Sequence, residues 1–236
     1  MPTKATPRFT LEGLQEISRG FEGRRPEDVL RWAFETFGDR VALAYSFGGA
    51  SGAALLHMAA RINPGVRVFY LDTGFLFPET YAQVEEASRR YGITPLGVKS
   101  ALTPEEQARE YGEALWQRNP DLCCQLRKVE PNARALAGLE AWITGIRRDQ
   151  GETRAATGIV EWSEKFGLVK INPMAHWGKQ KVWGYILEHK VPYNTLLDRG
   201  YKSLGCTHCT RPVAASEDER AGRWSEFDKT ECGLHT

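Results

Sequence analysis

The stretch Val41-Ala-Leu-Ala-Tyr-Ser-Phe-Gly-Gly-Ala-Ser-Gly52 predicts the fold of this chain. Residues 41–45 are apolar and suit a buried strand, and residues 46–52 form a loop of small residues. Residues 53–60 are apolar and rich in alanine, which favours a helix. A strand that passes through a short loop into a helix begins a βαβ unit, so we expect an α/β fold with parallel strands.

The segments around this stretch repeat the alternation of strand and helix. The pattern predicts a mostly parallel sheet flanked by helices in one domain over residues 26–210. A loosely attached leader at 1–25 precedes it, and a weakly packed, mobile tail at 211–236 follows it. The expected helices span 26–37, 78–91, 104–116, 124–139 and 180–190, and the further strands span 66–71, 94–98, 141–145 and, as a short edge strand, 169–172.

The composition is that of a globular protein without a general affinity for polyanions. The 236 residues are 42% hydrophobic and 26% charged. The 31 Lys and Arg nearly balance the 30 Asp and Glu, so the net charge of +1 gives no general attraction to nucleic acid or acidic membranes. No signal-peptide core and no apolar run of about 18 residues occur. We therefore expect a cytoplasmic protein whose nucleotide site, if it has one, is built locally.

The loop after the first predicted strand is a candidate anion site. Backbone N–H groups at a helix N-terminus attract anions, and glycines let the backbone approach phosphate oxygens closely. The loop lacks the Gly-Lys-Ser/Thr ending of a Walker loop, which argues against a nucleoside triphosphatase, and a tight turn without ligand is the alternative. A second loop at Asp72-Thr-Gly74 follows the next strand at the same sheet edge, which favours a nucleotide crevice. The candidate contacts are Ser46, Gly48, Gly49, Ser51 and Thr73.

Four of the five cysteines form two tight pairs, Cys123-Cys124 and Cys206-x-x-Cys209, which indicates metal ligation in a reducing compartment. The C-x-x-C pair alone would suit zinc, an iron–sulfur centre or a redox dithiol. Adjacent cysteines are awkward ligands for tetrahedral zinc, whereas four thiolates suit a [4Fe–4S] cluster. Two buried thiols beside a zinc half-site are the alternative.

The fifth cysteine, Cys232, lies in the C-terminal segment Lys229-Thr-Glu-Cys-Gly-Leu-His235. Gly233 leaves its sulfur accessible, and Lys229 and His235 are expected to lower the pKa of the thiol, because a cation stabilises the reactive thiolate. A tail that closes over a site can then present an adduct to a partner. We predict that Cys232 is a nucleophile.

Several basic residues lie beside these loops and cysteines. Arginine forks suit sulfate and phosphate oxygens, although solvated surface charge is the simpler interpretation of any single arginine. The basic candidates are Arg127, Lys128, Arg147, Arg148, Arg154, Arg211, Arg220 and Arg223.

Taken in order, the motifs resemble the assimilatory adenylyl-sulfate reductases of bacteria. The resemblance runs from about residue 41 to the end of the chain and rests on the two cysteine pairs and the cysteine-containing C-terminal segment. It also includes Asp72-Thr-Gly-x-x-Phe-Pro-Glu-Thr-Tyr81, Cys-Cys-x-x-Arg-Lys128, Trp142-x-Thr-Gly-x-Arg-Arg-Asp-Gln150 and Arg220-x-Gly-Arg-Trp224.

The resemblance implies an adenine nucleotide α-hydrolase-like fold and the reduction of adenosine 5′-phosphosulfate (APS) to sulfite and AMP. It implies that Cys232 attacks the substrate sulfur and forms an S-sulfocysteine, from which thioredoxin or glutaredoxin releases sulfite. It also implies that Cys123, Cys124, Cys206 and Cys209 hold a [4Fe–4S] cluster that tunes the site electrostatically without carrying the electrons. Lys128 would then lie between cluster and substrate. Arg147, Arg154, Arg220, Arg223 and His235 complete the expected substrate contacts.

The first loop departs from the usual APS-type pattern. That pattern carries an acidic pair after Gly-Ala, whereas this chain has Ser51-Gly52, as in forms that accept 3′-phosphoadenosine 5′-phosphosulfate (PAPS). A missing carboxylate repels a 3′-phosphate less. The cluster cysteines favour APS, so we expect APS reduction, with PAPS or dual use as the alternative.

Two further functions remain open from the sequence. A tRNA thiolase would usually show Ser-Gly-Gly-x-Asp-Ser, and this loop has no aspartate. A cluster-bearing redox sensor would use Cys232 as its switch and bind no nucleotide. For the reductase, no thioredoxin-like domain follows Thr236, so a separate thiol protein is expected as donor. A homo-oligomer is expected, without nucleic-acid or membrane partners.

Overall fold

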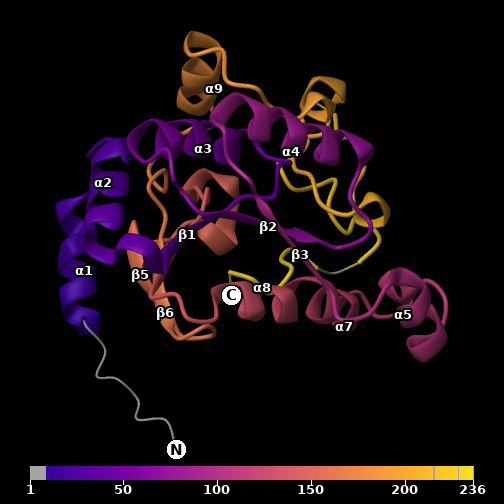
Figure 1. The fold of residues 1–236 in the computed structure, drawn as a ribbon. Coiled ribbons are helices and arrows are strands. Elements are labelled where there is room, and N and C mark those ends of the chain that lie inside the picture. The colour runs from indigo at the N-terminus through magenta and orange to yellow at the C-terminus, as the bar shows by residue number, and fades with distance from the viewer. Residues whose placement is uncertain (1–8, 215, 228, 236) are drawn as a thin grey trace, which may run out of the picture.

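The structure, a computed structural model, describes residues 9–214, 216–227 and 229–235 (Figure 1). In these residues a six-stranded sheet has the order β3-β2-β1-β4-β6-β5. All neighbouring strands pair in parallel except β5 and β6, which are antiparallel. The strands are β1 Val41–Ala44, β2 Val68–Asp72, β3 Leu96–Lys99, β4 Ala141–Ile143, β5 Val160–Ser163 and β6 Leu168–Ile171. The predicted α/β fold with a mostly parallel sheet is confirmed.

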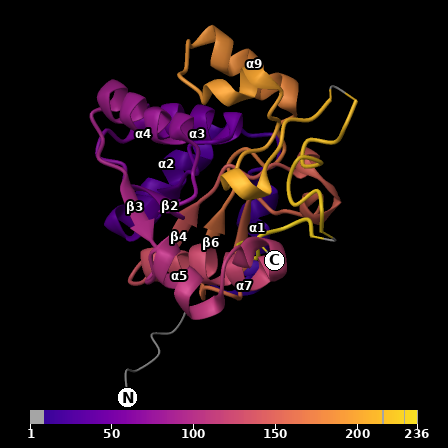
Figure 2. The same ribbon diagram turned by 90° about the vertical axis from the view of Figure 1, so that its right-hand side faces the viewer.

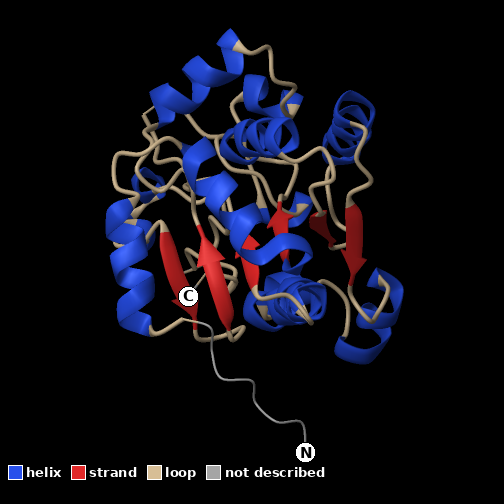
Figure 3. Cartoon of the chain, turned by 60° about the vertical axis from the view of Figure 1, so that its left-hand side comes forward, coloured by secondary structure: helices blue, strands red, loops and turns tan. Residues whose placement is uncertain are grey.

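Helices cover both faces of this sheet, as Figure 3 shows. In β1, Val41 and Leu43 belong to the larger apolar core, whereas Ala42 between them belongs to a smaller core with Trp142 of β4. This alternation is expected where both faces of a parallel sheet are buried. The helices are α1 Leu11–Gly20, α2 Pro26–Phe37, α3 Ala50–Ile62, α4 Pro78–Tyr91, α5 Pro104–Tyr111, α6 Leu115–Arg118, α7 Pro120–Cys124, α8 Glu130–Leu136 and α9 Lys179–Glu188.

The chain order of the strands reverses between β1 and β4. Strands β2 and β3 continue the sheet on one side of β1, and β4 and β6 continue it on the other. In open α/β sheets, ligands bind at such a reversal, beyond the carboxyl ends of the strands. The fold therefore directs the loops after β1, β2 and β4 toward one place.

The segment predicted to be a loosely attached leader contains a helix that packs on the core. Leu14 of α1 is buried, and the Ser18 hydroxyl accepts hydrogen bonds from the backbone N–H groups of Ile159 and Val160, at 3.0 and 3.2 Å. Loose attachment is therefore wrong for residues 11–20. Residues 1–8 lie outside the described part of the chain.

The predicted edge strand at 169–172 corresponds to β6, which is an interior strand. Strand β5 lies outside it and pairs antiparallel with it through residues such as Trp162, opposite Val169. Strand β5 was not predicted, because Glu161 and Ser163 interrupt its apolar character. A half-buried edge strand of four residues gives too short a pattern to identify.

Two predicted helices are broken. The helix expected at 104–116 ends at Gly112, whose φ of 83° no helical residue adopts, and α6 follows after the break. The helix expected at 124–139 has π-helical geometry over Gln125–Val129, between α7 and α8. Pro131 carries no N–H to donate to the carbonyl of residue 127, which is one reason why regular α-helical bonding is interrupted here.

The C-terminal segment folds back onto the domain. Figures 1 and 2 place its last described residues beside α7 and α8. Trp224 is 2% exposed and Glu231 is buried. The weak packing that we expected from the polar composition is therefore wrong for these residues. Among the helices of the described residues, none has the length and apolar character that a membrane span requires.

Candidate active site

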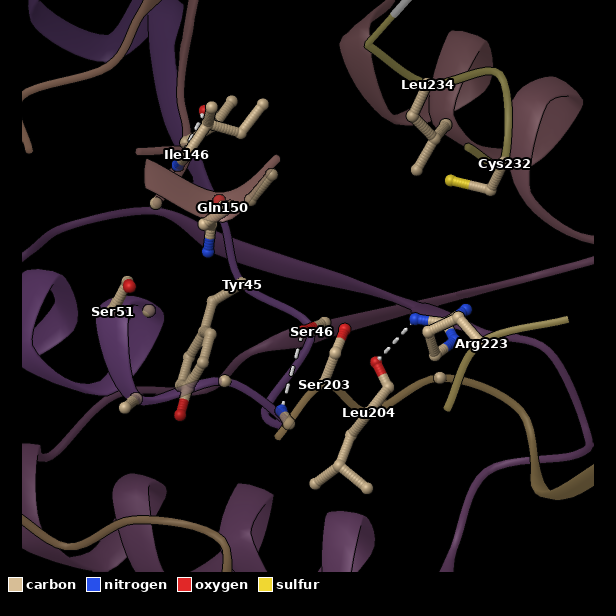
Figure 4. A pocket seen from close by; sticks show the side chains of 18 of the residues that line it. Tyr45, Ser46, Ser51, Ile146, Gln150, Ser203, Leu204, Arg223, Cys232 and Leu234 are labelled. Atoms are coloured by element: carbon tan, nitrogen blue, oxygen red, sulfur yellow. Dashed lines mark hydrogen bonds between the residues drawn. The ribbon is translucent and has the colours of Figure 1, made fainter. Parts of the chain in front are cut away.

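A cleft of about 320 Å³ lies at the carboxyl ends of β1, β2 and β4 (Figure 4). The loops after these strands line it together with residues 201–206 and the C-terminal segment. The basic candidates Arg127, Arg148 and Arg211 do not line it, whereas every residue predicted as a substrate contact or as the nucleophile does. These residues are Ser46, Gly48, Gly49, Ser51, Thr73, Lys128, Arg147, Arg154, Arg220, Arg223, Cys232 and His235.

The loop after β1 presents the N-terminus of α3 to the cleft. Gly49 is the N-cap of this helix, and the Ser46 hydroxyl accepts a hydrogen bond from the Gly48 N–H at 3.4 Å. A Cβ on Gly48 would lie 2.7 Å from the Cβ of Leu204, so glycine lets the two loops meet. The N–H groups at the start of α3 are thus available to an anionic group, as expected from the sequence.

The loop after β2 is organised by Asp72, whose carboxylate accepts hydrogen bonds from the Tyr81 hydroxyl at 2.7 Å and from the Gly74 N–H at 3.1 Å. Thr73 follows it, lines the cleft, and has its hydroxyl 3.4 Å from the sulfur of Cys206. The aspartate therefore shapes the loop, and the threonine connects the cleft to a cysteine.

The π-helical segment presents Lys128 to the cleft. Lys128 is 9% exposed and also lines a second, smaller cavity that contains the paired cysteines. Burial lowers the pKa of its ammonium, but the neighbouring Cys206 and Cys232 raise it more, so the pKa lies above its ordinary value. No carboxylate pairs with Lys128 among the described residues, and its ammonium lies 5.6 Å from the Trp224 ring centroid.

Arg223 is a second buried cation without a carboxylate partner in the described part of the chain. Its guanidinium donates to the carbonyls of Leu204 at 3.1 Å and Cys209 at 3.3 Å, and stacks 4.3 Å from the Trp224 ring centroid. Gly205 makes room for it, because a Cβ there would collide with the guanidinium. Backbone carbonyls orient this arginine without neutralising it, so its charge is available to an anion.

The other arginines of the cleft are paired with acids. Arg147 donates to Asp149 at 2.8 Å and to Glu219 at 3.2 Å, and also bonds to the hydroxyl of Ser51. Arg154 and Arg220 both pair with Glu231, the residue before Cys232. The sequence identified these arginines but not their acids, since Glu219 and Glu231 lie in a segment that we expected to be weakly packed.

The sulfur of Cys232 points into the cleft (Figure 4). The neighbouring His235 is buried, with its ring stacked on Trp142 at 5.4 Å between centroids. Burial, helped by the charges of Lys170 and Arg154, holds the pKa of His235 well below its ordinary value. The lowered pKa disfavours a cationic imidazole, so the structure gives no support to the expectation that His235 acts as a cation on the thiol. Lys229 is paired with Asp121, whereas Lys128 and Arg220 are cations of the cleft whose charges interact with Cys232.

The other four cysteines, Cys123, Cys124, Cys206 and Cys209, line the second cavity together. All are free thiols. Burial and the neighbouring cysteines raise the pKa of Cys123 to about 12 and that of Cys209 to about 11. The predicted convergence of the two pairs is therefore observed.

Three aromatic or imidazole rings lie beside this cavity. Trp116 stacks on His208 at 3.8 Å between centroids, and Phe75 packs edge-on against His208 at 4.5 Å. Nothing in the local sequence pattern predicted this stack, because Trp116 follows a break in a helix that we expected to be continuous.

Within the described residues, no three His, Cys, Asp or Glu side chains are arranged to hold a single metal ion. The zinc half-site alternative gains no support from this finding. Four free thiols that line one cavity nevertheless have the donor chemistry of an iron–sulfur cluster.

The doubly wound sheet and the cation-lined cleft at its strand reversal define an α/β protein with the adenine nucleotide α-hydrolase-like fold. Residues 40–212 match the family model described as "Phosphoadenosine phosphosulfate reductase domain". The chain therefore belongs to this family.

The relatives and solved structures support this membership. The chain is 48% identical to the adenosine 5′-phosphosulfate reductase of Halalkalibacterium halodurans over 94% of this chain and 96% of that protein. It is 46% identical to the phosphoadenosine 5′-phosphosulfate reductase of Gloeobacter violaceus over 94% and 93%. The crystal structure of a Candida auris phosphoadenylyl-sulfate reductase in a phosphate complex has a TM-score of 0.77 and 35% identity, covering 89% of this chain and all of that one.

A more distant structure supports the fold alone. An FMN adenylyltransferase of Candida glabrata has a TM-score of 0.57 at 15% identity, covering 92% of this chain and 74% of that one. The expected fold is confirmed.

Proposed function

We propose that this protein is an oxidoreductase of sulfate assimilation that reduces APS to sulfite and AMP. The observation that carries the proposal is the position of Cys232, which lines the cation-rich cleft at the strand reversal together with Lys128. Relatives of nearly equal length carry the name adenosine 5′-phosphosulfate reductase. The cleft combines an anion-binding loop, a nucleophilic sulfur and buried cations, which is the chemistry that a sulfonucleotide requires.

The proposed reaction has two steps. The Cys232 thiolate attacks the sulfate sulfur, so that a sulfur–sulfur bond forms and the bond from sulfur to the bridging oxygen breaks. AMP leaves with the bonding electron pair, and S-sulfocysteine remains. A thiolate of thioredoxin or glutaredoxin then attacks the Cys232 sulfur, sulfite leaves with the electron pair, and a second thiol of the donor resolves the mixed disulfide. The donor dithiol supplies the two electrons.

The buried cations make the first step possible. Negative oxygens shield the sulfate sulfur from an anionic nucleophile, and the leaving AMP gains charge as the bond breaks. Lys128 and Arg223 supply positive charge that no carboxylate of the described residues neutralises. Fixed charges in a site with little water stabilise such a transition state strongly.

The paired cysteines are proposed to hold a [4Fe–4S] cluster through Cys123, Cys124, Cys206 and Cys209. Support comes from the four free thiols around one cavity, which Lys128 also lines. When bound, the cluster supplies an electrostatic influence on the substrate site. Thr73 and Lys128 are the cleft residues beside these thiols.

A dual or PAPS-specific reductase is the second candidate, because Ser51 stands where APS-type loops are acidic and two relatives carry PAPS reductase names. Turnover on APS and PAPS at equal concentration separates the candidates. We also propose a cytoplasmic homo-oligomer with a separate thiol protein as donor.

The variant Cys232→Ser tests the assignment. It should bind AMP as the unmodified protein does and release no sulfite from APS. Sulfite release by this variant would refute the nucleophile. Failure of the unmodified protein to bind AMP in calorimetry would favour the redox-sensor function instead.

A further inference from the structure

Glu231 is the residue immediately before the proposed nucleophile and is buried between two arginines. Its side chain is 6% exposed. One carboxylate oxygen accepts from Nε of Arg154 at 2.7 Å and from the Thr153 hydroxyl at 3.3 Å. The other accepts from Nη2 of Arg154 at 3.0 Å and from Nη2 of Arg220 at 3.2 Å. The carboxylate thus ties the C-terminal segment, which carries both Glu231 and Arg220, to Thr153 and Arg154 of the cleft wall.

The electrostatic environment keeps this bridge ionised. Burial alone would raise the pKa of Glu231, but the hydrogen bond and charge of Arg154 and the charge of Arg220 lower it more, so the pKa lies below its ordinary value. Removing one member of a buried ion pair leaves the others uncompensated, which is strongly unfavourable. Glu231 therefore neutralises Arg154 only while the C-terminal segment stays in place, whereas Arg220 lies in that segment itself.

The backbone around Cys232 is held by further cations. Arg220 donates to the carbonyl of Thr230 at 2.6 and 3.3 Å, and Lys165 donates to the carbonyl of Gly233 at 2.5 Å. These bonds fix the chain on both sides of the cysteine. The Glu231 carboxylate is the contact that ties this backbone to Arg154 on the opposite segment.

We propose that Glu231 is a positioning residue that locks the C-terminal segment over the cleft and so holds the Cys232 sulfur where the substrate sulfate binds. The effect of Glu231 on catalysis rests on the proposed function. Its effect on the position of the C-terminal segment does not. In this structure Arg154 and Arg220, which the sequence marked as substrate contacts, also hold the segment that carries the nucleophile. Lys128 and Arg223 remain the cations that face the substrate.

The lock is tested first without substrate, by the rate at which iodoacetamide alkylates Cys232 in the nucleotide-free protein, followed by peptide mass spectrometry. In Glu231→Gln the rate plateau at high pH should rise about tenfold or more, because breaking a buried pair usually costs more than the 1.4 kcal/mol that tenfold represents. The alkylation rate is measured as a function of pH. A change in the accessibility of Cys232 changes the plateau of this curve, whereas a change in the pKa of its thiol shifts the midpoint.

Three further variants keep the test independent of one substitution. Glu226→Gln removes an exposed acid of the same segment and should leave the plateau unchanged. Glu231→Asp keeps the charge with a shorter reach and should give an intermediate plateau. Arg154→Gln breaks the bridge from the other side and should raise the plateau as Glu231→Gln does, with thermal melting as the check on folding. An unchanged plateau in folded Glu231→Gln or Arg154→Gln would overturn the proposal.

The catalytic consequence is measured in single turnovers with APS. Formation of the sulfite adduct on Cys232 should slow about tenfold in Glu231→Gln, because a smaller fraction of molecules has the C-terminal segment closed over the cleft. Release of sulfite from a preformed adduct by thioredoxin should not slow. Equal slowing of both steps would contradict a positioning role. If even the unmodified protein forms no adduct, the proposed function fails, while the alkylation result still decides the lock.

Discussion

Two groups of buried cations line the same cleft and differ in what neutralises them. Arg147, Arg154 and Arg220 each pair with a carboxylate, from Asp149, Glu219 or Glu231. Lys128 and Arg223 are as deeply buried and meet thiols, backbone carbonyls and the Trp224 ring instead. The paired group holds the protein together, and the unpaired group keeps charge available for an anionic substrate.

Lys128 remains charged although no carboxylate of the described residues pairs with it. A buried basic group without a counter-charge normally loses its proton, as His57 shows, where burial lowers the pKa to about 4. Lys128 is also buried, yet its pKa is raised, because Cys206 and Cys232 stabilise the ammonium. These two cysteines therefore favour the charged form of the lysine.

The largest expected effect comes from removing an unpaired cation. Lys128→Met should slow formation of the Cys232 adduct from APS by about 10²–10³-fold, the range seen when a single preorganised charge or donor is removed. AMP binding should change much less, because the charge acts mainly on the sulfate. Rapid-quench single turnovers and AMP calorimetry measure the two quantities. A loss confined to AMP affinity would show that Lys128 binds the nucleotide and does not assist the reaction.

A smaller effect is expected from removing one of the two acids that pair with a cleft arginine. Glu219→Gln leaves Arg147 with Asp149 and adds positive charge to the cleft. Affinity for AMP should rise several-fold, since one partly buried charge contributes on the order of 1 kcal/mol. Calorimetry at two salt concentrations checks this. Unchanged affinity would place Arg147 out of reach of the nucleotide.

His57 extends the comparison to a basic group outside the cleft. It is 6% exposed, and its Nδ1 lies 3.2 Å from the Tyr91 hydroxyl. Its folded pKa of about 4 lies below the unfolded value of about 6.5, so the unfolded state binds the proton first. Stability should therefore fall as pH drops from 6.5 toward 4.

Thermal melting between pH 7 and pH 5 measures this contribution. The melting temperature of the unmodified protein should fall more over this interval than that of His57→Gln. Part of the fall should remain in the variant, because burial also lowers the pKa of His176. An equal fall of the melting temperature in both proteins would mean that His57 does not contribute to the pH dependence of stability.

The smallest effect is expected for a cation that is paired and exposed. Arg211 bonds Glu217 at 2.9 Å, and its side chain is 46% exposed. Exposed pairs contribute little, because water and salt screen them. Arg211→Ala should leave adduct formation and melting temperature unchanged within error. A clear loss of activity would require a second anion site near Arg211.

The sequence predicted the cleft better than the segment that closes it. Small residues after β1, Thr73 after β2 and Arg147 after β4 follow strands whose order could be inferred, so their meeting at one sheet edge was predictable. Trp224 and Glu231 could not be placed, because they pack against cations of distant elements, Lys128 beside Trp224 and Arg154 beside Glu231. The π-helical geometry around Lys128 escaped prediction as well, since its residues suit an ordinary helix.

The central claim is that Cys232 attacks the sulfur of a sulfonucleotide. The most direct test incubates anaerobically purified protein with APS and no thiol reductant, with PAPS in parallel, and examines peptides by mass spectrometry. The account predicts one SO₃ group on Cys232 from APS, and none on Cys123, Cys124, Cys206 or Cys209. An iron-loaded protein that binds AMP but carries no adduct on Cys232 would contradict it.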